Sequence, residues 1–400
     1  MNREYKKDFP IFKNNPDLIY LDGAVTSQKP KMVIDGIMEY LENGYSGIHR
    51  GTYAISEKSE ILYKKSKEKV CEFIWSDSYK EIIYTYNSTY ALNLLSSSIW
   101  ISKQLKKWDK VLLSIVEHNA NVVPWLILKE QIWIDIEYVW VDENYNIDID
   151  DFKLKYDDKV KIISFAHVSN VTWQIFDLEL IWKLKKEETI FIVDASQSIP
   201  HIKIDVKKMN CDYLFFTGHK IFADTWIWVL WWKEKLLKNL NPSFSWWWAI
   251  WSVKNNTFTY WSLPDKFEPG TQNITWAISL LKWFEYIESI WWYNVLEKYE
   301  KKLVSYFLWK LKNYKNIKLI GSNNLKNRLW VFSMIVEWVH SNDVADLLAE
   351  KNIAIRSWKH CAHTLFWNIG LTHSLRVSLY IYNTKEDIDI FFKNIDNILA

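Results

Sequence analysis

Short apolar runs alternate with longer amphipathic stretches through the middle of this 400-residue chain. The runs are rich in Ile, Val, Leu, Phe and Tyr, which favour strands, and they lie at 82–85, 111–114, 136–139, 160–165, 190–194 and 213–216. Stretches with helical spacing separate several of them, near 89–105, 120–131 and 177–187. This alternation predicts an α/β fold with a mostly parallel sheet wrapped by helices.

The pattern changes on both sides of this region. Residues 1–19 form a short amphipathic lead-in, and helical spacing follows at 31–43 and 56–73. Towards the C-terminus the pattern predicts two helices and then short strands, at 275–288, 293–313, 330–336 and 353–356. We therefore expect a lead-in segment over 1–19, a large domain over 20–270 and a smaller C-terminal α+β domain over 271–400.

Charge and composition exclude several classes of protein. The net charge is +2 with both signs interspersed, so nucleic acid is not an expected partner. No apolar run approaches the roughly 18 residues of a membrane span, and the N-terminus has no apolar signal segment. We expect a soluble, cytoplasmic protein. Cys71, Cys211 and Cys361 are too far apart for a disulfide framework or a metal site, so any cysteine chemistry rests on a single thiol.

Tryptophan is abnormally frequent and glycine abnormally rare, with 26 tryptophans against 9 glycines. Average usage would give about 7% glycine. Several tryptophans stand in turn contexts that favour glycine, such as Trp108, Trp173 and the run 246–248. We infer that the gene uses UGA for glycine and that the printed sequence shows these codons as tryptophan. Trp125, which follows Pro124, is expected to be a genuine tryptophan.

Lys220 follows the apolar run at 213–216 through Thr217, Gly218 and His219. A lysine at the end of a buried strand is a candidate catalytic group, because desolvation lowers the pKa of the ammonium and leaves free amine that can form a Schiff base with a carbonyl. The alternative is that Lys220 merely opens a solvated loop. The residues that follow other strands decide between these two interpretations.

Polar residues follow three other strands. Ser88 and Thr89 open a helix, where they either cap it or bind a phosphate. His118 either stacks on a planar ring or is a polar loop residue, and Asp194 either caps a helix or pairs with a protonated ring nitrogen. With Lys220, these groups are the parts needed to hold pyridoxal 5′-phosphate (PLP). Neither glycine-rich nucleotide-binding motif follows the first strand.

Ordered segments along nearly the whole chain share a pattern with one enzyme family. They are Tyr20-Leu21-Asp22, His49-Arg50-Gly51, Glu117-His118, Ala120 to Trp125, His167 to Asn170, Val193-Asp194, Gly218-His219-Lys220, Phe267 to Thr271, His360-Cys361-Ala362, Arg376 and Tyr382-Asn383-Thr384. On these segments the chain resembles a group II (SUF-type) cysteine desulfurase, a class V aminotransferase-family enzyme. The resemblance implies the PLP-dependent transferase fold type I, with the nucleophile loop in the small domain.

The resemblance also implies roles for the cofactor-binding residues. Lys220 would hold PLP through a Schiff base, Asp194 would pair with the ring nitrogen, Gln197 would donate to the ring hydroxyl and His118 would stack on the ring. The phosphate would be held by Ser88, Thr89, Thr217 and His219. Thr271 is implied to reach the phosphate of the neighbouring subunit, and a homodimer with shared active sites follows.

For the substrate, the resemblance implies that Asn170 and Arg376 bind the carboxylate of L-cysteine and that Arg356 lines the same pocket. Cys361 stands in the nucleophile position, where a neighbouring histidine or the cofactor could favour its thiolate. Lys220 would carry the proton. The implied reaction converts L-cysteine into L-alanine and leaves a persulfide on Cys361, which a sulfur-acceptor protein collects, with iron–sulfur cluster assembly the expected destination.

Two alternatives stay open. A selenocysteine lyase needs the same residues. A relic or scaffold protein without catalysis would follow if the indoles are genuine at the positions where the family has glycine, which are Trp173, Trp226, Trp228, Trp246 to Trp248 and Trp358. Asn87, Asn119 and Lys359 are milder departures from the family pattern.

Overall fold

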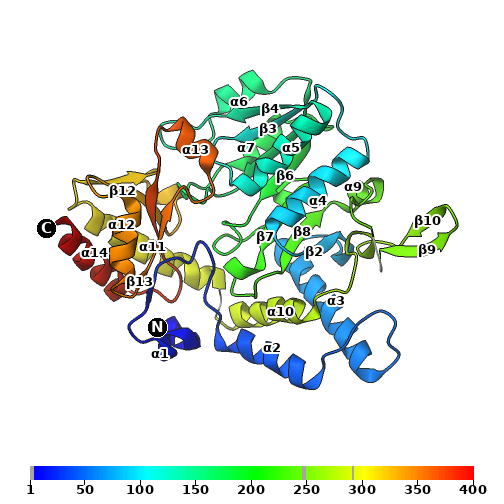
Figure 1. The fold of residues 1–400 in the computed structure, drawn as a ribbon, viewed down its shortest axis with the longest axis horizontal. Helices are drawn as coiled ribbons and strands as arrows, with labels where there is room; N and C mark the ends of the chain where they lie inside the picture. Colours follow the sequence, from blue (N-terminus) through cyan, green and yellow to red (C-terminus); the bar gives the residue numbers. More distant parts are fainter. Residues whose placement is uncertain (1–3, 246–248, 291) are drawn as a thin grey trace.

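A central sheet organises the larger part of the molecule (Figure 1). A computed structural model describes residues 4–245, 249–290 and 292–400, and within these residues the largest sheet has seven strands in the order β2-β8-β7-β6-β5-β3-β4. They are β2 (Ile82–Thr85), β3 (Lys110–Ser114), β4 (Asp135–Val139), β5 (Val160–Ala166), β6 (Ile190–Asp194), β7 (Tyr213–Thr217) and β8 (Trp228–Trp232).

The sheet is mostly parallel, as the alternation predicts. Neighbouring strands from β4 to β7 are parallel, whereas β8 runs antiparallel to both β2 and β7. The apolar run that forms β8 is Trp-Val-Leu-Trp-Trp, and it was not among the expected strands. Its position beside β7 places Trp228 opposite Thr217 in the register.

Helices cover both faces of this sheet. On one face, α4 (Ser88–Ile101) and α5 (Val123–Ile132) pack through Leu92, Leu95 and Trp125 against a cluster that includes Val111 and Leu113. The opposite face carries α6 (Ile149–Lys155), α7 (Leu178–Leu184) and α8 (Val206–Met209). Successive strand residues point to opposite faces, so the continuous apolar runs of the parallel strands reflect burial on both sides. The short helix α9 (Glu234–Asn239) follows β8.

Three long helices lie below the sheet in Figure 1. They are α2 (Lys31–Asn43), α3 (Ala54–Ile74) and α10 (Ile274–Ser289), and α10 packs against both others. The helical spacing of Val33, Ile37 and Tyr40 accounts for the apolar stripe of α2. The predicted ranges for these helices match within a few residues.

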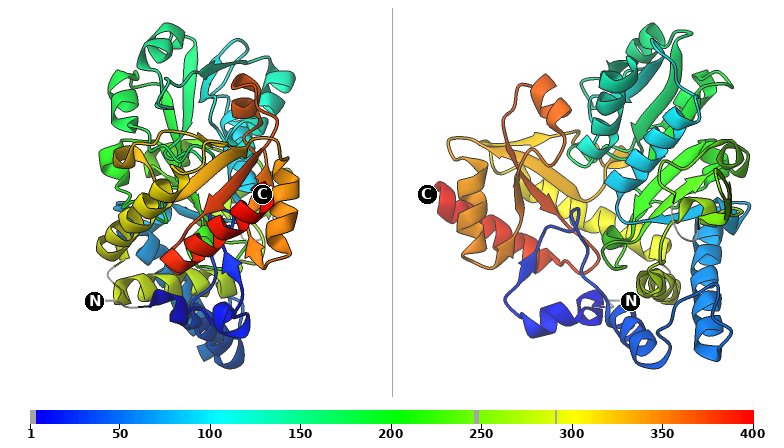
Figure 2. Two further views of the ribbon diagram at one scale, coloured as in Figure 1. Left: turned by 90° about the vertical axis from the view of Figure 1, so that its left-hand side faces the viewer. Right: turned by 45° about the vertical axis from the view of Figure 1, so that its right-hand side comes forward.

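The C-terminal part is a second layer of strands and helices, seen on the left of the right-hand view in Figure 2. Within the described residues it has a four-stranded antiparallel sheet in the order β11-β12-β15-β14. Its elements are α11 (Trp292–Leu311), β11 (Ile317–Ile320), β12 (Val331–Val336), α12 (Ser341–Ala349), β13 (Ile353–Ala354), β14 (Arg356–Trp358), α13 (His363–Asn368), β15 (Ser374–Ser378) and α14 (Lys385–Leu399).

The N-terminal segment joins this C-terminal part. After α1 (Pro10–Asn14), β1 (Ile19–Tyr20) pairs in parallel with β13, and Asp22 forms an isolated bridge with Ser378. The division into domains at residues 19 and 270 stays a prediction. Any such division has to accommodate both this pairing and the packing of α10 on α2 and α3.

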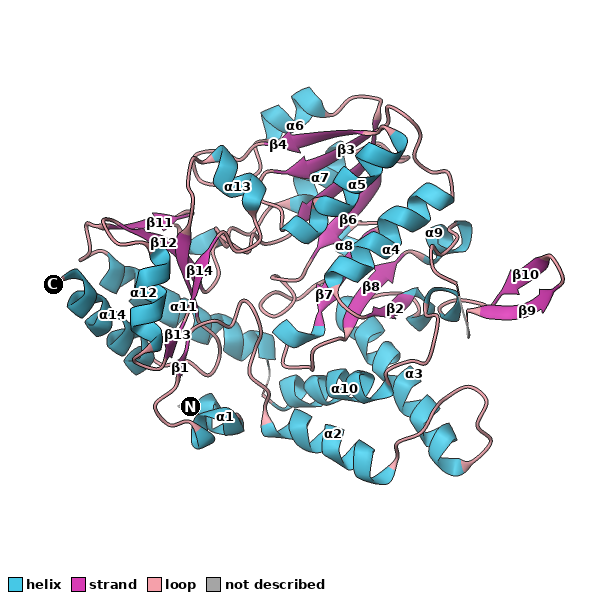
Figure 3. Ribbon diagram, in the orientation of Figure 1, coloured by secondary structure: helices cyan, strands magenta, loops and turns pink. Residues whose placement is uncertain are grey.

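A separate hairpin of β9 (Ile250–Lys254) and β10 (Thr257–Tyr260) extends away from the body of the molecule (Figure 3). Short 3₁₀ helices occupy Tyr5–Asp8, Tyr79–Glu81, Asn119–Asn121, Gly218–Lys220, Asp265–Phe267 and Leu325–Asn327. Among the helices of the described part, none combines the length and apolar character needed to cross a membrane.

The backbone supports the interpretation of many tryptophans as glycines. Among the described residues, left-handed φ angles between 55° and 98° occur at Trp75, Trp108, Trp133, Trp173, Trp226, Trp338 and Trp358. Such angles are disfavoured for a bulky side chain and favour glycine. Two of these residues cap helices, Trp75 after α3 and Trp133 after α5, at the site where glycine is common.

Other tryptophans differ from this group. Trp125 is fully buried within α5, as expected for a genuine tryptophan. Trp228 lies in a strand with no left-handed angle, so its backbone carries no signal for glycine. The run 246–248 lies outside the described residues.

Candidate active site

One pocket collects nearly all of the residues expected to be functional. It has a volume of about 190 Å³, and the expected residues that line it are Ser88, Thr89, His118, Asn170, Asp194, Gln197, His219, Lys220, Arg356, Cys361 and Arg376. Polar residues that follow β2, β3, β5, β6 and β7 meet there, as expected for the carboxyl ends of strands in an α/β sheet. The C-terminal part supplies Arg356, Cys361 and Arg376.

The turn that carries Lys220 is fixed at both ends. Gly218 follows β7 directly, and a Cβ on it would lie 2.6 Å from the Ile227 carbonyl oxygen, so only glycine fits there. The His219 carbonyl accepts hydrogen bonds from the Ser27 backbone N–H at 2.9 Å and the Lys29 Nζ at 3.4 Å. These contacts tie the turn to the N-terminal segment and hold the Lys220 side chain in the pocket.

Burial sets the protonation of Lys220 and Asp194. Desolvation lowers the pKa of Lys220 to about 8, although the nearby Asp194 acts in the opposite direction. Desolvation raises the pKa of Asp194, and hydrogen bonds from Ser196 oppose this rise. The Ser196 backbone N–H donates to Asp194 Oδ1 at 2.8 Å. Lys220 therefore has an appreciable free-amine fraction near neutral pH.

His118 is held as a neutral ring. Burial and the charge of Lys220 lower its pKa to about 3, and its Nδ1 accepts a hydrogen bond from the Ala120 backbone N–H at 3.1 Å. The ring proton therefore resides on Nε2. Glu117 lies buried beside it and accepts from the Asn121 side chain at 2.7 Å and the Ala166 N–H at 3.0 Å. The Ala120 donor orients the imidazole, and the contacts of Glu117 hold the loop that carries it.

The other end of the pocket presents donors suited to an anion. Helix α4 begins at Ser88 after the cap Asn87, whose side chain accepts from the Tyr90 N–H at 2.7 Å. First-turn N–H groups of a helix have no partner within the helix. His219 lines the same pocket, and burial lowers its pKa to about 3.

Thr217 and Trp228 adjoin this end in different ways. The Thr217 side chain is buried at the end of β7, does not line the pocket, and its Oγ1 has no hydrogen-bond partner among the described residues. The Trp228 indole does line the pocket, with its ring centroid 5.2 Å from that of His219. A tryptophan here takes up space that a glycine would leave to a ligand.

Two arginines face the pocket from neighbouring strands. Arg356 and Arg376 are direct partners in the β14–β15 register. Arg376 is buried and donates through Nη1 to the Asn170 carbonyl at 3.0 Å, and burial lowers its pKa to about 10, so it remains a cation. Guanidinium groups bind carboxylates through two parallel hydrogen bonds. We call the part of the pocket formed by Arg356 and Arg376 the arginine corner, and it can bind a carboxylate.

The loop of Cys361 packs against the loop of His118. The Asn119 backbone N–H donates to the Cys361 carbonyl at 2.6 Å, and the Asn119 side chain lies 2.6 Å from His363 Nδ1. Cys361 itself is exposed and adopts φ 57°. Its neighbour His360 is buried, contacts Ser374 Oγ through Nε2 at 2.8 Å, and has a pKa lowered to about 2. His360 is therefore neutral and does not supply the positive charge expected to favour a thiolate.

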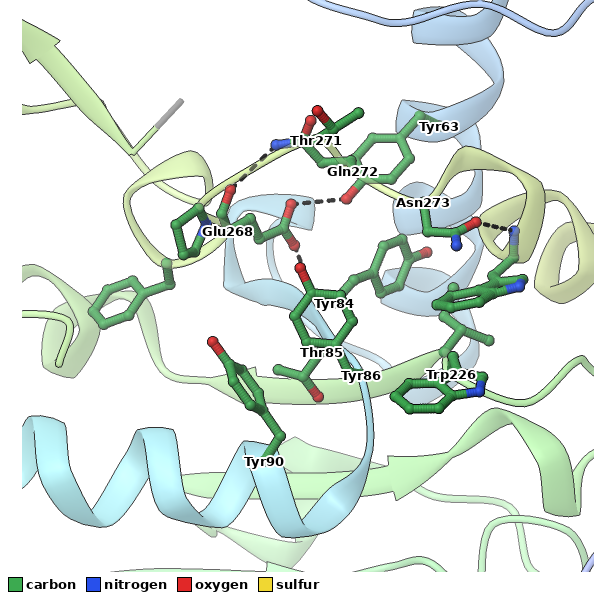
Figure 4. Close-up of a pocket in the computed structure, with 14 residues that line it drawn as sticks. Tyr63, Tyr84, Thr85, Tyr86, Tyr90, Trp226, Glu268, Thr271, Gln272 and Asn273 are labelled. Carbon is green, nitrogen blue, oxygen red and sulfur yellow. Dashed lines mark hydrogen bonds between the residues drawn. The ribbon is translucent and has the colours of Figure 1, made fainter. Parts of the chain in front are cut away.

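Thr271 lies in a separate pocket, drawn in Figure 4 with Tyr86 and Trp226. Beneath it, the buried Glu268 pairs with Lys67 at 2.7 Å and accepts from the Tyr63 hydroxyl at 2.8 Å. Thr271 is thus absent from the pocket of its own chain's Lys220, a placement compatible with the expected role in a neighbouring subunit. That role stays a prediction.

Sequence reasoning overlooked some residues of the site. Ser196 lines the pocket beside Asp194. The sequence marks Asn119 only as a departure from the family pattern. The signal for Ser196 was its position two residues after Asp194, where a backbone N–H readily bonds to the preceding carboxylate. No sequence signal pointed to the contact of Asn119 with the Cys361 loop.

A match to one family model shows which protein family the chain belongs to. Residues 19–391 match the model described as aminotransferase class-V. The chain belongs to the class-V aminotransferase family. Its members are PLP-dependent enzymes, and this one has the family's fold, with a large, mostly parallel sheet flanked by helices.

Individual relatives agree with this family assignment. A "Probable cysteine desulfurase" of Synechocystis sp. is 36% identical over 98% of this chain and 94% of its own length. A "Cysteine desulfurase" of Wigglesworthia glossinidia brevipalpis is 35% identical over 98% of this chain and 96% of its own length. The solved apo structure of a cysteine desulfurase from Thermococcus onnurineus NA1 matches with a TM-score of 0.93 and 31% identity, covering 100% of this chain and 98% of that one.

The residues of this family member fit PLP. A lysine with a lowered pKa, a buried carboxylate and a neutral imidazole line one pocket. The unpartnered Thr217 hydroxyl lies at the end of the strand that leads to Lys220, which is compatible with a donor to the cofactor. Among the described residues that line the pocket, Trp228 opposes the fit, because its indole lies against His219.

Proposed function

We propose that this protein is a PLP-dependent cysteine desulfurase of group II, which converts L-cysteine into L-alanine and carries the sulfur as a persulfide on Cys361. The observation that carries the proposal is the single pocket that brings Lys220 and Asp194 together with Cys361 and the arginine pair. The names of the relatives support the same activity.

When bound, PLP acts as an electron sink that stabilises negative charge at the substrate Cα. The chain would hold it through Lys220, with Asp194 facing the ring nitrogen and His118 stacked on the ring. Ser88, Thr89, Thr217 and His219 would bind the phosphate. A buried carboxylate keeps a ring nitrogen protonated because the opposite charges stabilise each other.

Substrate binding would rest on the arginine corner. Arg376 and Asn170 would bind the carboxylate of L-cysteine, with Arg356 beside them. This fixes the Cα near the Lys220 amine, which at a pKa of about 8 can both accept and return a proton near neutral pH. Orientation of this kind lowers the barrier by removing the entropy cost of alignment.

Cys361 would then accept the sulfur. Its thiolate attacks the sulfur of L-cysteine, an S–S bond forms, and the C–S bond breaks with its electron pair left on carbon. A proton on that carbon completes the methyl group of L-alanine. The exposure of Cys361 suits the next step, in which an acceptor thiolate attacks the persulfide.

Partners beyond the substrate belong to the same proposal. We propose a homodimer in which Thr271 reaches the phosphate site of the neighbouring subunit, a sulfur-acceptor protein, and delivery to iron–sulfur cluster assembly in the cytoplasm. The position of Thr271 outside the Lys220 pocket supports the shared site.

Replacement of the thiol tests the proposal. Cys361→Ala is expected to abolish L-alanine release from L-cysteine while PLP absorbance is kept and selenocysteine turnover persists. The half-buried Cys71, whose Sγ donates to the Ser76 carbonyl, provides the control, since Cys71→Ala is expected to keep both activities. Equal loss of both activities in the Cys361 variant would contradict the assigned role. Turnover of selenocysteine alone by the unmodified protein would favour a selenocysteine lyase.

A further inference from the structure

Asp22 contacts both arginines of the pocket, Arg356 and Arg376, through its side chain. It lies two residues after β1, where its backbone forms a bridge with Ser378 at the end of β15. The pairing of β1 with β13 brings the N-terminal segment to the C-terminal part. Asp22 is thus placed against the arginine corner by backbone pairing.

The carboxylate of Asp22 faces both arginines. Its Oδ2 lies 3.5 Å from Arg356 Nε and its Oδ1 lies 3.6 Å from Arg376 Nη2. The two arginines are direct partners across antiparallel strands, where like charges repel each other. One carboxylate between two guanidinium groups offsets that repulsion and holds both side chains at the pocket.

These contacts leave hydrogen-bonding capacity for a ligand. Distances of 3.5 and 3.6 Å are longer than a good charge-assisted hydrogen bond. Within the described part of the chain, the buried atoms Asp22 Oδ1 and Arg376 Nε have no hydrogen-bond partner. Asp22 therefore attracts the arginines electrostatically without saturating their N–H donors.

The charges at this corner sum to one positive charge. Arg356 and Arg376 contribute two positive charges and Asp22 one negative charge, while the buried His360 beside them is neutral because burial lowers its pKa to about 2. A ligand with one carboxylate neutralises the corner, whereas a second carboxylate would leave an uncompensated negative charge near Asp22.

We propose that Asp22 is a positioning and specificity-determining residue, which orients Arg356 and Arg376 and sets the charge of the corner so that it accepts a single carboxylate. The inference deepens the proposed function, because it takes the arginine pair as the binding site of the substrate carboxylate. According to this inference, the arginine corner binds monocarboxylates. It rejects dicarboxylates because their second negative charge is not neutralised there.

Anion binding to the purified, PLP-loaded protein tests the inference. Acetate and malonate are titrated by calorimetry at constant ionic strength into the unmodified protein and Asp22→Asn, which keeps the shape of the side chain and removes its charge. Because the corner then has two positive charges, the ratio of malonate to acetate association constants is expected to rise by at least about tenfold. Asp22→Glu is expected to keep the original ratio.

Two controls separate charge at the corner from other effects. Asp35→Asn removes one negative charge from an exposed side chain of α2 that pairs with Lys31, and it is expected to leave the ratio unchanged. The double variant Asp22→Asn with Arg356→Gln returns the corner to one positive charge and is expected to restore the original ratio. A malonate-to-acetate ratio in Asp22→Asn equal to that of the unmodified protein would overturn the inference.

The titration requires no turnover. A protein that binds these anions as expected but releases no L-alanine would contradict the proposed function and leave the role of Asp22 intact. If Asp22→Asn does not fold, Arg356→Gln alone provides the test. It makes the corner neutral, so malonate binding is expected to weaken more than acetate binding, and equal weakening would overturn the inference.

Discussion

Lys220 lies in a tight turn at a strand end and has a lowered pKa, and its local sequence indicates only the first of these properties. Gly218 permits a tight turn at the end of β7, and the surrounding pocket lowers the pKa of the amine to about 8. The position at a strand end could be predicted from sequence, because the apolar run and the polar residues after it are contiguous. The size of the shift depends on groups from distant segments, such as Asp194 and Arg376, and could not.

This pKa predicts how cofactor capture depends on pH. The neutral amine is the nucleophile, so the rate of PLP uptake by the cofactor-free protein is expected to rise with pH and level off above a midpoint of about 8. An unperturbed lysine would still be rising near its usual pKa of about 10.4. Absorbance of the bound cofactor after rapid mixing measures the rate. Lys220→Ala is the control and should capture none covalently.

The tryptophans with left-handed backbone angles allow a test of whether glycine is the native residue at these positions. Trp75 caps α3 with φ 61°, and relief of that strain in Trp75→Gly is expected to raise the free energy of unfolding by about 1 kcal/mol. Trp100 lies within the helix α4, so Trp100→Gly is expected to lower it by about 1 kcal/mol. Urea denaturation measures both.

Destabilisation by both changes would argue that tryptophan is native at position 75. The codons give an independent answer, since UGG at these positions would contradict the reassignment. The mass of the protein isolated from its own cells would be lower than that of the printed sequence if glycine is incorporated.

At the scale of elements, the Cys361 loop depends on the 3₁₀ turn that follows β3. Asn119→Ala removes the side-chain contacts with His363 and keeps the backbone donor to Cys361. Loss of two hydrogen bonds of about 1 kcal/mol each is expected to loosen the loop, so kcat should fall by up to about thirtyfold while PLP absorbance is unchanged. Hydrogen exchange over 359–363 should increase.

A remote asparagine gives the matched control for this prediction. Asn394 bonds within its own helix, α14, through a side-chain donor to the Ile390 carbonyl, and Asn394→Ala is expected to leave both kcat and loop exchange unchanged. Loss of PLP absorbance in Asn119→Ala would instead show that the residue supports the cofactor pocket.

Apolar periodicity is sufficient to predict the strands and helices whose burial it reflects. The strands β3 to β7 and helices such as α2 were predicted within a few residues, because their apolar periodicity reflects burial directly. The strand β8 is not among the predicted strands, and its Trp-Val-Leu-Trp-Trp sequence begins at Trp228, one of the positions where the resembled family has glycine. The pairing of β1 with β13 joins Ile19 to Ile353 and Tyr20 to Ala354, and no local pattern encodes a contact between residues so far apart in the sequence.

For the whole molecule, function depends on the meeting of the two parts. The central sheet supplies Lys220 and Asp194, and the C-terminal part supplies Cys361 and the arginines. Most of these residues could be assigned from the family resemblance. Asp22 could not, because its role depends on the pairing that brings the N-terminal segment beside β15, a contact visible only in three dimensions.

The persulfide on Cys361 tests the central claim most directly. The PLP-loaded protein is incubated with L-cysteine without reductant, and the mass of the peptide that contains Cys361 is measured together with L-alanine. The account predicts that this peptide gains one sulfur atom for each L-alanine released in the first turnover. Release of L-alanine with no sulfur on Cys361, or no L-alanine from a protein that shows bound-cofactor absorbance, would contradict it.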